Sequence, residues 1–153
     1  MKTSFFSKLS IITLAVISFA SCQNKGPYFT VEGKIANADT TMLYLERRSL
    51  NETTIIDSVK LDADGNFKFK EPALGYPEFY LLRMDKQSIN LAIDSIETIT
   101  VHASKPTFAS EYTIEGSEGS VKIKDIVFAQ NKLSRTVSDL RKQFESKGIS
   151  QDQ

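Results

Sequence analysis

The sequence predicts a mainly β domain, an antiparallel β-sandwich or open barrel of about 7–8 strands, followed by a C-terminal amphipathic helix. Apolar and polar residues alternate with a period of two in short runs between residues 28 and 116. Turn-forming residues separate these runs at short intervals. After residue 120 the apolar residues recur at helical spacing instead.

The first run shows the strand pattern most clearly. Phe29, Val31 and Ile35 alternate with polar or charged residues, as in a half-buried strand. The run 78–84 is apolar on both faces, which predicts a central strand covered on each side. The expected strands are 29–35, 42–47, 54–61, 67–70, 78–84, 89–93, 99–103 and 112–114.

The run 54–61 and the residues after it carry two further predictions. Ile55, Val59 and Leu61 fall on one side of the run, which predicts its core-facing side. The acidic segment 62–66 resembles a calcium loop, but Gly and Glu do not stand at the positions that an EF-hand requires. The sequence therefore predicts a turn between two strands there, and no metal site.

The runs 89–93 and 99–103 alternate in the same way and are separated by the turn residues Asp94-Ser95. This arrangement predicts a β-hairpin. Tyr112 and Ile114 begin one last short strand before the chain reaches Gly116.

The helix is predicted from an apolar stripe. Ile126, Leu133 and Leu140 recur every seven residues, with Val137 and Phe144 four residues after the last two. A helix from Ser120 to Ser146 runs about 40 Å at 1.5 Å per residue, whereas a seven-residue strand spans about 23 Å. We therefore expect part of the stripe to project past the sheets, and to mediate self-association or docking onto a partner domain.

Capping residues mark both ends of this helix. Ser117 or Ser120 can cap its start, and Gly148 is a natural stop. The expected helical segment is 117–148, and a tail of 149–153 follows.

The N-terminal segment 1–21 has the order of a secretory signal. Lys2 and Lys8 precede or flank an apolar segment, 9–20, and small residues follow it. The apolar segment is shorter than the roughly 20 residues of a membrane-spanning helix. The chain's only cysteine, Cys22, comes next.

Phe19-Ala20-Ser21-Cys22 resembles a bacterial lipoprotein signal, in which the cysteine is acylated and becomes the new N-terminus. Several acyl chains, such as palmitate, anchor a protein stably. The segment 22–27 then reads as a polar tether. The alternative is an ordinary signal cut after Ala20 or Ser21, which leaves a free thiol.

Composition excludes several classes of function. Removal of residues 1–21 leaves 132 residues with 17 basic and 19 acidic side chains, which argues against nucleic-acid binding. A single cysteine allows neither a disulfide framework nor a Cys-x-x-Cys redox site. His102 is the only histidine and is expected to face solvent, and no Gly-x-Ser-x-Gly occurs. The sequence thus predicts no catalytic residues, no cofactor and no enzymatic activity.

One aromatic cluster could bind a ligand. Tyr76, Phe79 and Tyr80, with Arg83 close by, could line a surface for a glycan or peptide. Core packing accounts for Phe79 equally well, since aromatic residues are common on strands.

Three segments together resemble a known family. They are Phe29 to Ile35, Ile56-Asp57-Ser58-Val59 leading to Asp64-Gly65-Asn66-Phe67, and Tyr112 to Ser117 before a charged helix. With the lipoprotein cysteine they look like the DUF4369 domain of Bacteroidetes lipoproteins, over about residues 28–146. That resemblance implies a thioredoxin-like domain of the alkyl hydroperoxide reductase/thiol-specific antioxidant type farther along the chain. The Cys-x-x-Cys motif of such a domain does not occur in this sequence, so the resemblance implies no thiol-disulfide activity for these residues.

The expected organisation is a signal (1–21), a tether (22–27), a sandwich domain (28–116), a helix (117–148) and a tail (149–153). We expect a lipid-anchored, extracytoplasmic protein that acts in binding or as a spacer. The tether lacks the run of acids that resembles a surface-export signal, which favours the outer membrane's periplasmic side. Two alternatives stay open: an accessory module or fragment of a periplasmic thiol-disulfide oxidoreductase, and a stand-alone glycan or peptide binder.

Overall fold

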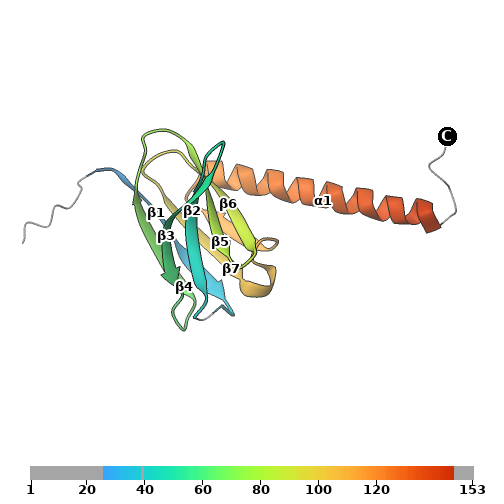
Figure 1. Ribbon diagram of the computed structural model, residues 1–153, viewed down its shortest axis with the longest axis horizontal. Coiled ribbons are helices and arrows are strands. Elements are labelled where there is room, and N and C mark those ends of the chain that lie inside the picture. The colour runs from blue at the N-terminus through green and yellow to red at the C-terminus, as the bar shows by residue number, and fades with distance from the viewer. Residues whose placement is uncertain (1–25, 39, 147–153) are drawn as a thin grey trace, which may run out of the picture.

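The computed structural model describes residues 26–38 and 40–146 (Figure 1). Eight strands precede one long helix, as the sequence predicts. The elements are β1 (Tyr28–Ala36), β2 (Met42–Arg48), β3 (Thr53–Lys60), β4 (Asn66–Pro72), β5 (Glu78–Met84), β6 (Gln87–Ile93), β7 (Thr98–Ser104), the 3₁₀ turn η1 (Lys105–Thr107), β8 (Tyr112–Glu115) and α1 (Glu118–Ser146).

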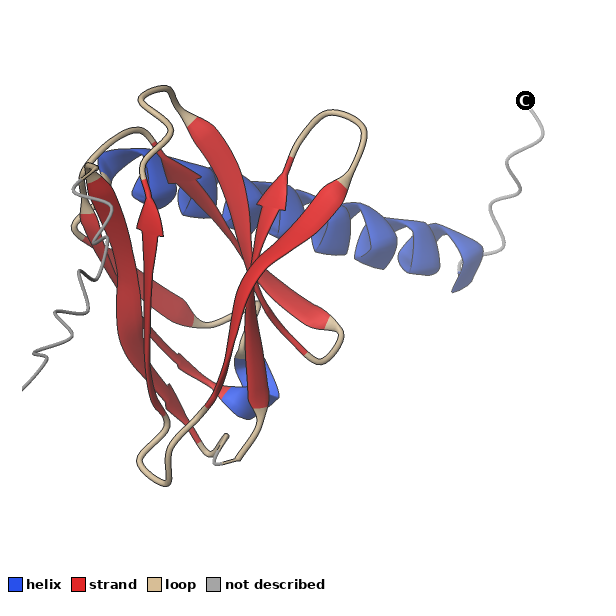
Figure 2. Cartoon of the chain, turned by 60° about the vertical axis from the view of Figure 1, so that its left-hand side comes forward, coloured by secondary structure: helices blue, strands red, loops and turns tan. Residues whose placement is uncertain are grey.

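The strands form two four-stranded sheets that pack face to face (Figure 2). One sheet has the order β4-β1-β7-β8 and the other β3-β2-β5-β6. Every pair of neighbouring strands is antiparallel except β1 and β7, which run parallel. The predicted sandwich is therefore confirmed, with one parallel pair inside it.

Alternation explains the core. In β1, Phe29, Val31 and Ile35 point inward and are buried, while the residues between them are less buried. Phe67 and Phe69 do the same in β4, where they alternate with the exposed Asn66, Lys68 and Lys70. The core is made of apolar side chains from both sheets and from three connections between strands: Phe29, Val31, Ile35, Ala38, Leu43, Leu45, Leu61, Phe67, Phe69, Tyr80, Leu82, Met84, Ile89, Leu91, Ile93, Ile99, Val101, Phe108, Tyr112 and Ile114.

The predicted hairpin of 89–93 and 99–103 is wrong. β6 pairs with β5, whereas β7 belongs to the other sheet and pairs with β1 and β8. The connection crosses between the sheets: Asp94 N donates to the Glu97 carboxylate at 2.9 Å, and Glu97 O accepts from Thr30 N on β1 at 2.8 Å. A four-residue connection serves a hairpin or a crossing between sheets equally well, so alternation alone did not separate the two.

The predicted core side of β3 is also partly wrong. A β-bulge between the Leu45 and Glu46 positions of β2 leaves an extra residue, Ile56, on β3. An extra residue reverses the alternation beyond it. Ile55 therefore faces solvent, and Ile56 packs against the core together with Val59.

β5 is central in its sheet, as predicted, but within the described residues no further layer covers its outer face. Tyr80, Leu82 and Met84 face the core, while Phe79 on the outer face is about half exposed. The apolar residues on both faces thus correctly predicted that β5 is a central strand. The expected cover on its outer face was wrong, because Phe79 is about half exposed.

The segment 62–66 forms the predicted turn between β3 and β4. The Asp62 carboxylate accepts hydrogen bonds from Asp64 N at 2.9 Å and Asn66 N at 2.8 Å, and Gly65 adopts a positive φ of 77°. These bonds, the backbone N–H of Asn66 foremost, lower the pKa of Asp62. The Asp62 carboxylate thus stabilises the turn by accepting hydrogen bonds from its backbone.

Candidate functional site

The junction between β8 and α1 is built for an abrupt change of direction. Gly116 has a φ of 83°, and a Cβ atom there would lie 2.0 Å from Thr98 O. Ser117 then caps the helix: its Oγ accepts a hydrogen bond from Ser120 N at 3.2 Å. The prediction of a serine cap is confirmed, and its second candidate, Ser120, has another task.

Ser120 joins the helix to the free edge of β6. Its fully buried Oγ accepts a hydrogen bond from Ala92 N at 3.1 Å and donates one to Ala92 O at 3.0 Å. Ser117 Oγ also donates to Ala92 O, at 3.2 Å. These serines supply the partners that the edge strand's backbone would otherwise lack. The first turn of α1 therefore takes the place of a further strand.

Apolar contacts hold the next two turns. Phe128 packs edge-on against Tyr112 of β8, with the ring centroids 5.1 Å apart, and Val121 packs against the core. Burial raises the pKa of Tyr112 to about 12, and the nearby Asp125 carboxylate adds to the effect. The helix is thus attached to β6 and β8 by its first three turns.

Beyond Phe128 the helix leaves the sandwich. Every residue from Ala129 to Ser146 is exposed, which confirms that the helix projects (Figure 1). The predicted stripe is exposed as well, each of its side chains between 47% and 64%. Its members are Ile126, Leu133, Val137, Leu140 and Phe144.

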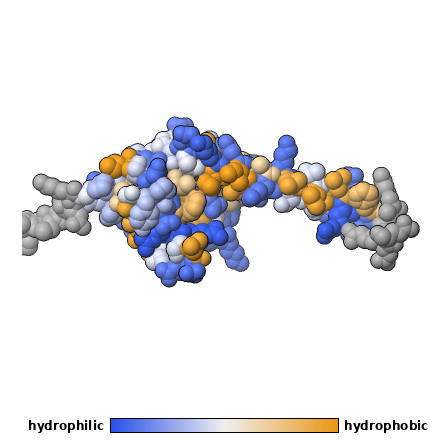
Figure 3. Space-filling model, turned by 90° about the horizontal axis from the view of Figure 1, so that it is seen from above, coloured by the Kyte–Doolittle hydropathy of each residue, from blue (hydrophilic) through white to orange (hydrophobic). Residues whose placement is uncertain are grey.

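The stripe points away from the sandwich. At about 100° of rotation per residue, Ser120, Val121 and Phe128 lie on the opposite side of the helix from Leu133 and the rest of the stripe. The space-filling view shows apolar residues continuing along the projecting part of α1 (Figure 3). The sandwich to which the helix belongs therefore leaves this stripe uncovered along its whole length.

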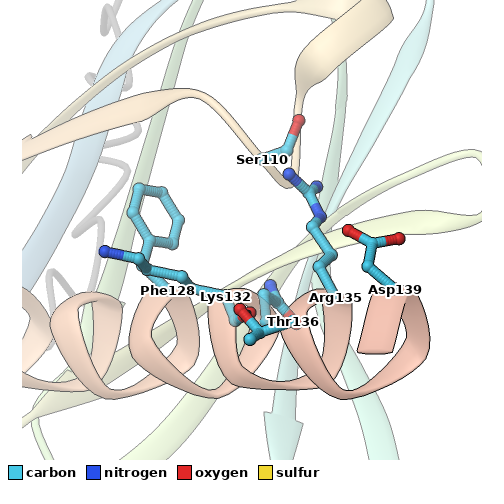
Figure 4. Close-up of a pocket in the computed structure, with 7 residues that line it drawn as sticks. Ser110, Phe128, Lys132, Arg135, Thr136 and Asp139 are labelled. Carbon is cyan, nitrogen blue, oxygen red and sulfur yellow. The ribbon is translucent and has the colours of Figure 1, made fainter. Parts of the chain in front are cut away.

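A groove of about 260 Å³ lies on the sandwich side of the helix, facing Ser110 in the loop before β8. Phe128 forms one wall, and the Arg135 side chain points toward Ser110 with Asp139 beside it (Figure 4). Charges of both signs line it, so it suits no single class of charged ligand. Sequence reasoning missed this groove because its two walls come from segments whose spacing carries no signal. Its lining is Ser110, Phe128, Asn131, Lys132, Arg135, Thr136 and Asp139.

The predicted aromatic ligand surface is divided between two faces of β5. Tyr80 is buried in the core, its ring 5.0 Å from that of Phe29, and burial raises its pKa. Phe79 and Arg83 lie on the outer face, because neighbouring residues of a strand point to opposite sides. Tyr76 is exposed and shares only a shallow crevice with Tyr80.

Arg83 has partners within the outer face. Its Nε donates to the Glu46 carboxylate at 2.6 Å, and its guanidinium lies 4.3 Å from the centre of the Tyr44 ring. Glu46 is buried, so Arg83 neutralises a charge that the fold has taken out of water. The four residues Tyr76, Phe79, Tyr80 and Arg83 are therefore not brought together at one site.

Two remaining candidates are placed as follows. His102 lies on β7 and is exposed, as predicted. Cys22, with the signal and most of the tether, lies outside the described residues. Within the part of the chain that the structure describes, no group of three or more acidic, His or Cys side chains could hold a metal ion. In that same part, no helix combines the length and apolar character needed to cross a bilayer.

Comparison with known proteins identifies one domain. The model of a family described as a domain of unknown function (DUF4369) matches residues 29–122, more than half of the chain. The match covers all eight strands and the first turn of α1, and it stops before the projecting part of the helix. No curated protein matches the chain.

Proposed function

We propose that this chain, which belongs to the DUF4369 family, is a lipid-anchored extracytoplasmic module that holds and displays its projecting helix. Acylation of Cys22 would attach the chain to a membrane, with the periplasmic face of the outer membrane as its location. The sandwich would serve as a spacer and the stripe on α1 as the binding surface. Catalysis has no part in this proposal.

The observation that carries the proposal is the placement of the two ends. The start of β1 and the end of α1 lie on opposite sides of the molecule (Figure 1). Cys22 stands six residues before Tyr28, a distance of at most about 20 Å for an extended chain. The 29 residues of α1 extend for about 44 Å. An anchor at Cys22 would thus keep the sandwich near the membrane and direct the stripe away from it.

Fatty-acid labelling tests the anchoring. Cells that produce the full chain are grown with labelled palmitate, and Cys22→Ser is compared with the unchanged chain. Because Cys22 is the only cysteine, we expect label and membrane association in the unchanged chain and neither in the variant. Ser21→Ala serves as a matched control that keeps the thiol. Equal membrane association of the Cys22→Ser variant would contradict the proposal.

A second function is favoured by the uncovered helix itself. A helix that leaves its domain with an exposed apolar stripe also suits a connector to another domain, as in an accessory module of a thiol-disulfide oxidoreductase. Sequencing the gene past codon 153 tests this alternative. An in-frame continuation that encodes Cys-x-x-Cys would support it, and a stop codon there would count against it.

A further inference from the structure

The stripe of α1 follows a seven-residue repeat. In a heptad written abcdefg, apolar residues at a and d keep one face of a helix toward a partner when two helices supercoil. With Ile126 at d, the remaining d positions are Leu133 and Leu140, and the a positions are Ile123, Gln130, Val137 and Phe144.

The residue types at these positions favour a coiled coil of two helices. In parallel coiled coils, β-branched residues at a with Leu at d favour two helices over three or four, and Val137 and Leu140 provide this combination here. One polar residue, Gln130, interrupts the a positions. A single polar a residue fixes the register, because any shifted alignment places its amide among apolar side chains.

The seam is open to a partner of the same size. It faces away from the sandwich, so two helices can approach along it while the two sandwiches stay on opposite sides. The five exposed side chains of the stripe leave on the order of 500 Å² uncovered on each copy, and a pair would bury on the order of 1,000 Å², the lower limit of a specific interface.

Charge does not oppose such a pair. The positions that flank the seam are uncharged except for Lys122 and Arg141, whose neighbours across a parallel pair are Val127 and Thr136. The other charged side chains of the projecting helix lie on its outer faces. The flanking residues are Lys122, Val127, Ala129, Ser134, Thr136, Arg141 and Gln143.

From this geometry we infer that a second copy of the chain covers the stripe. The two α1 helices pair in parallel as a two-stranded coiled coil from Ile123 to Phe144, with the two Gln130 side chains facing each other. Parallel helices place both β1 strands at one end, as anchoring in one membrane requires. Anchoring in one membrane rests on the proposed function, whereas the heptad positions do not depend on it. Anchoring would raise the effective concentration and so favour a pair of this small area.

Cysteine cross-linking of the full chain in mild detergent tests the pairing. Phe144→Cys places a thiol at the far end of the seam, and Lys142→Cys places one on the opposite face of the same turn. After mild oxidation we expect about tenfold more cross-linked dimer from Phe144→Cys than from Lys142→Cys, because only the seam holds two thiols together. Cross-links through Cys22 appear equally in both and in the unchanged chain.

A mixture and a second substitution complete the test. In an antiparallel pair each a position faces a d position, so Phe144→Cys meets Ile126→Cys, and cross-linking that occurs only when these two variants are mixed would overturn the parallel arrangement. Adding Leu133→Glu to Phe144→Cys should lower the yield to that of Lys142→Cys. Leu133 is exposed, so circular dichroism should show an unchanged fold.

The outcomes also separate this inference from the proposed function. Equal yields from Phe144→Cys and Lys142→Cys would overturn the pairing, whether or not Cys22 is acylated. A strong Phe144→Cys cross-link in a chain whose Cys22 carries no lipid would support the pairing and contradict only the anchoring.

Discussion

Replacing Ser120 by alanine should weaken the attachment of the helix to the edge of β6. Its hydroxyl makes two hydrogen bonds to Ala92, and the substitution leaves Ala92 N without its partner. Ala92 O keeps the hydrogen bond from Ser117, so only the Ala92 N–H is left without a partner. A buried unsatisfied donor costs about 1–3 kcal/mol. We therefore expect the free energy of unfolding to fall by about 2 kcal/mol.

Urea denaturation measures this change, and hydrogen exchange of the Ala92 amide measures its origin. Ser138→Ala is the matched control, because Ser138 is exposed on the projecting part of the same helix. Alanine has the higher helix propensity, so the control should be slightly more stable than the unchanged chain. Exchange at Ala92 should become faster in Ser120→Ala alone. Equal stability of the two variants, with an unchanged Ala92 exchange rate, would refute the proposed attachment of the helix.

Two further predictions concern the sandwich. Arg83→Met should destabilise the fold by about 2–4 kcal/mol, because it leaves the buried Glu46 carboxylate unpaired, and adding Glu46→Gln should recover part of the loss. A double-mutant cycle in urea measures this coupling, and additive effects would contradict it. Stability should also fall as pH rises from 10 toward 12: the Tyr112 pKa is raised by burial, so its phenol ionises earlier in the unfolded chain than in the fold. Tyr112→Phe should flatten the curve of stability against pH in that range, and an unchanged slope would argue against a buried phenol.

The sequence predicted the strands well, since inward and outward residues alternate in most of them, with the bulged pair of β2 and β3 as the exception. In β4, for example, Phe67 and Phe69 alternate with polar and charged residues, which predicts one buried face only. Strand pairing was harder to predict, because alternation tells which face of a strand is buried but not which strand lies beside it. The crossing from β6 to β7 depends on the bond between Glu97 O and Thr30 N, residues far apart in the sequence.

In the candidate site, too, local features were predictable and features that depend on distant segments were not. The apolar stripe and the serine cap are local patterns, and the structure places both as expected. The role of Ser120 was not predictable, since it depends on the unpaired edge of a strand that was assigned to a hairpin. The aromatic cluster failed for a simpler reason: Phe79 and Tyr80 are adjacent in a strand and cannot share a face.

The state of Cys22 in mature protein tests the proposed function most directly. Intact mass spectrometry of the chain purified from its native host gives the N-terminal residue and any attached mass in one measurement. The proposal predicts a chain that begins at Cys22 and carries the mass of several acyl groups. A mature chain whose cysteine is a free thiol would contradict it.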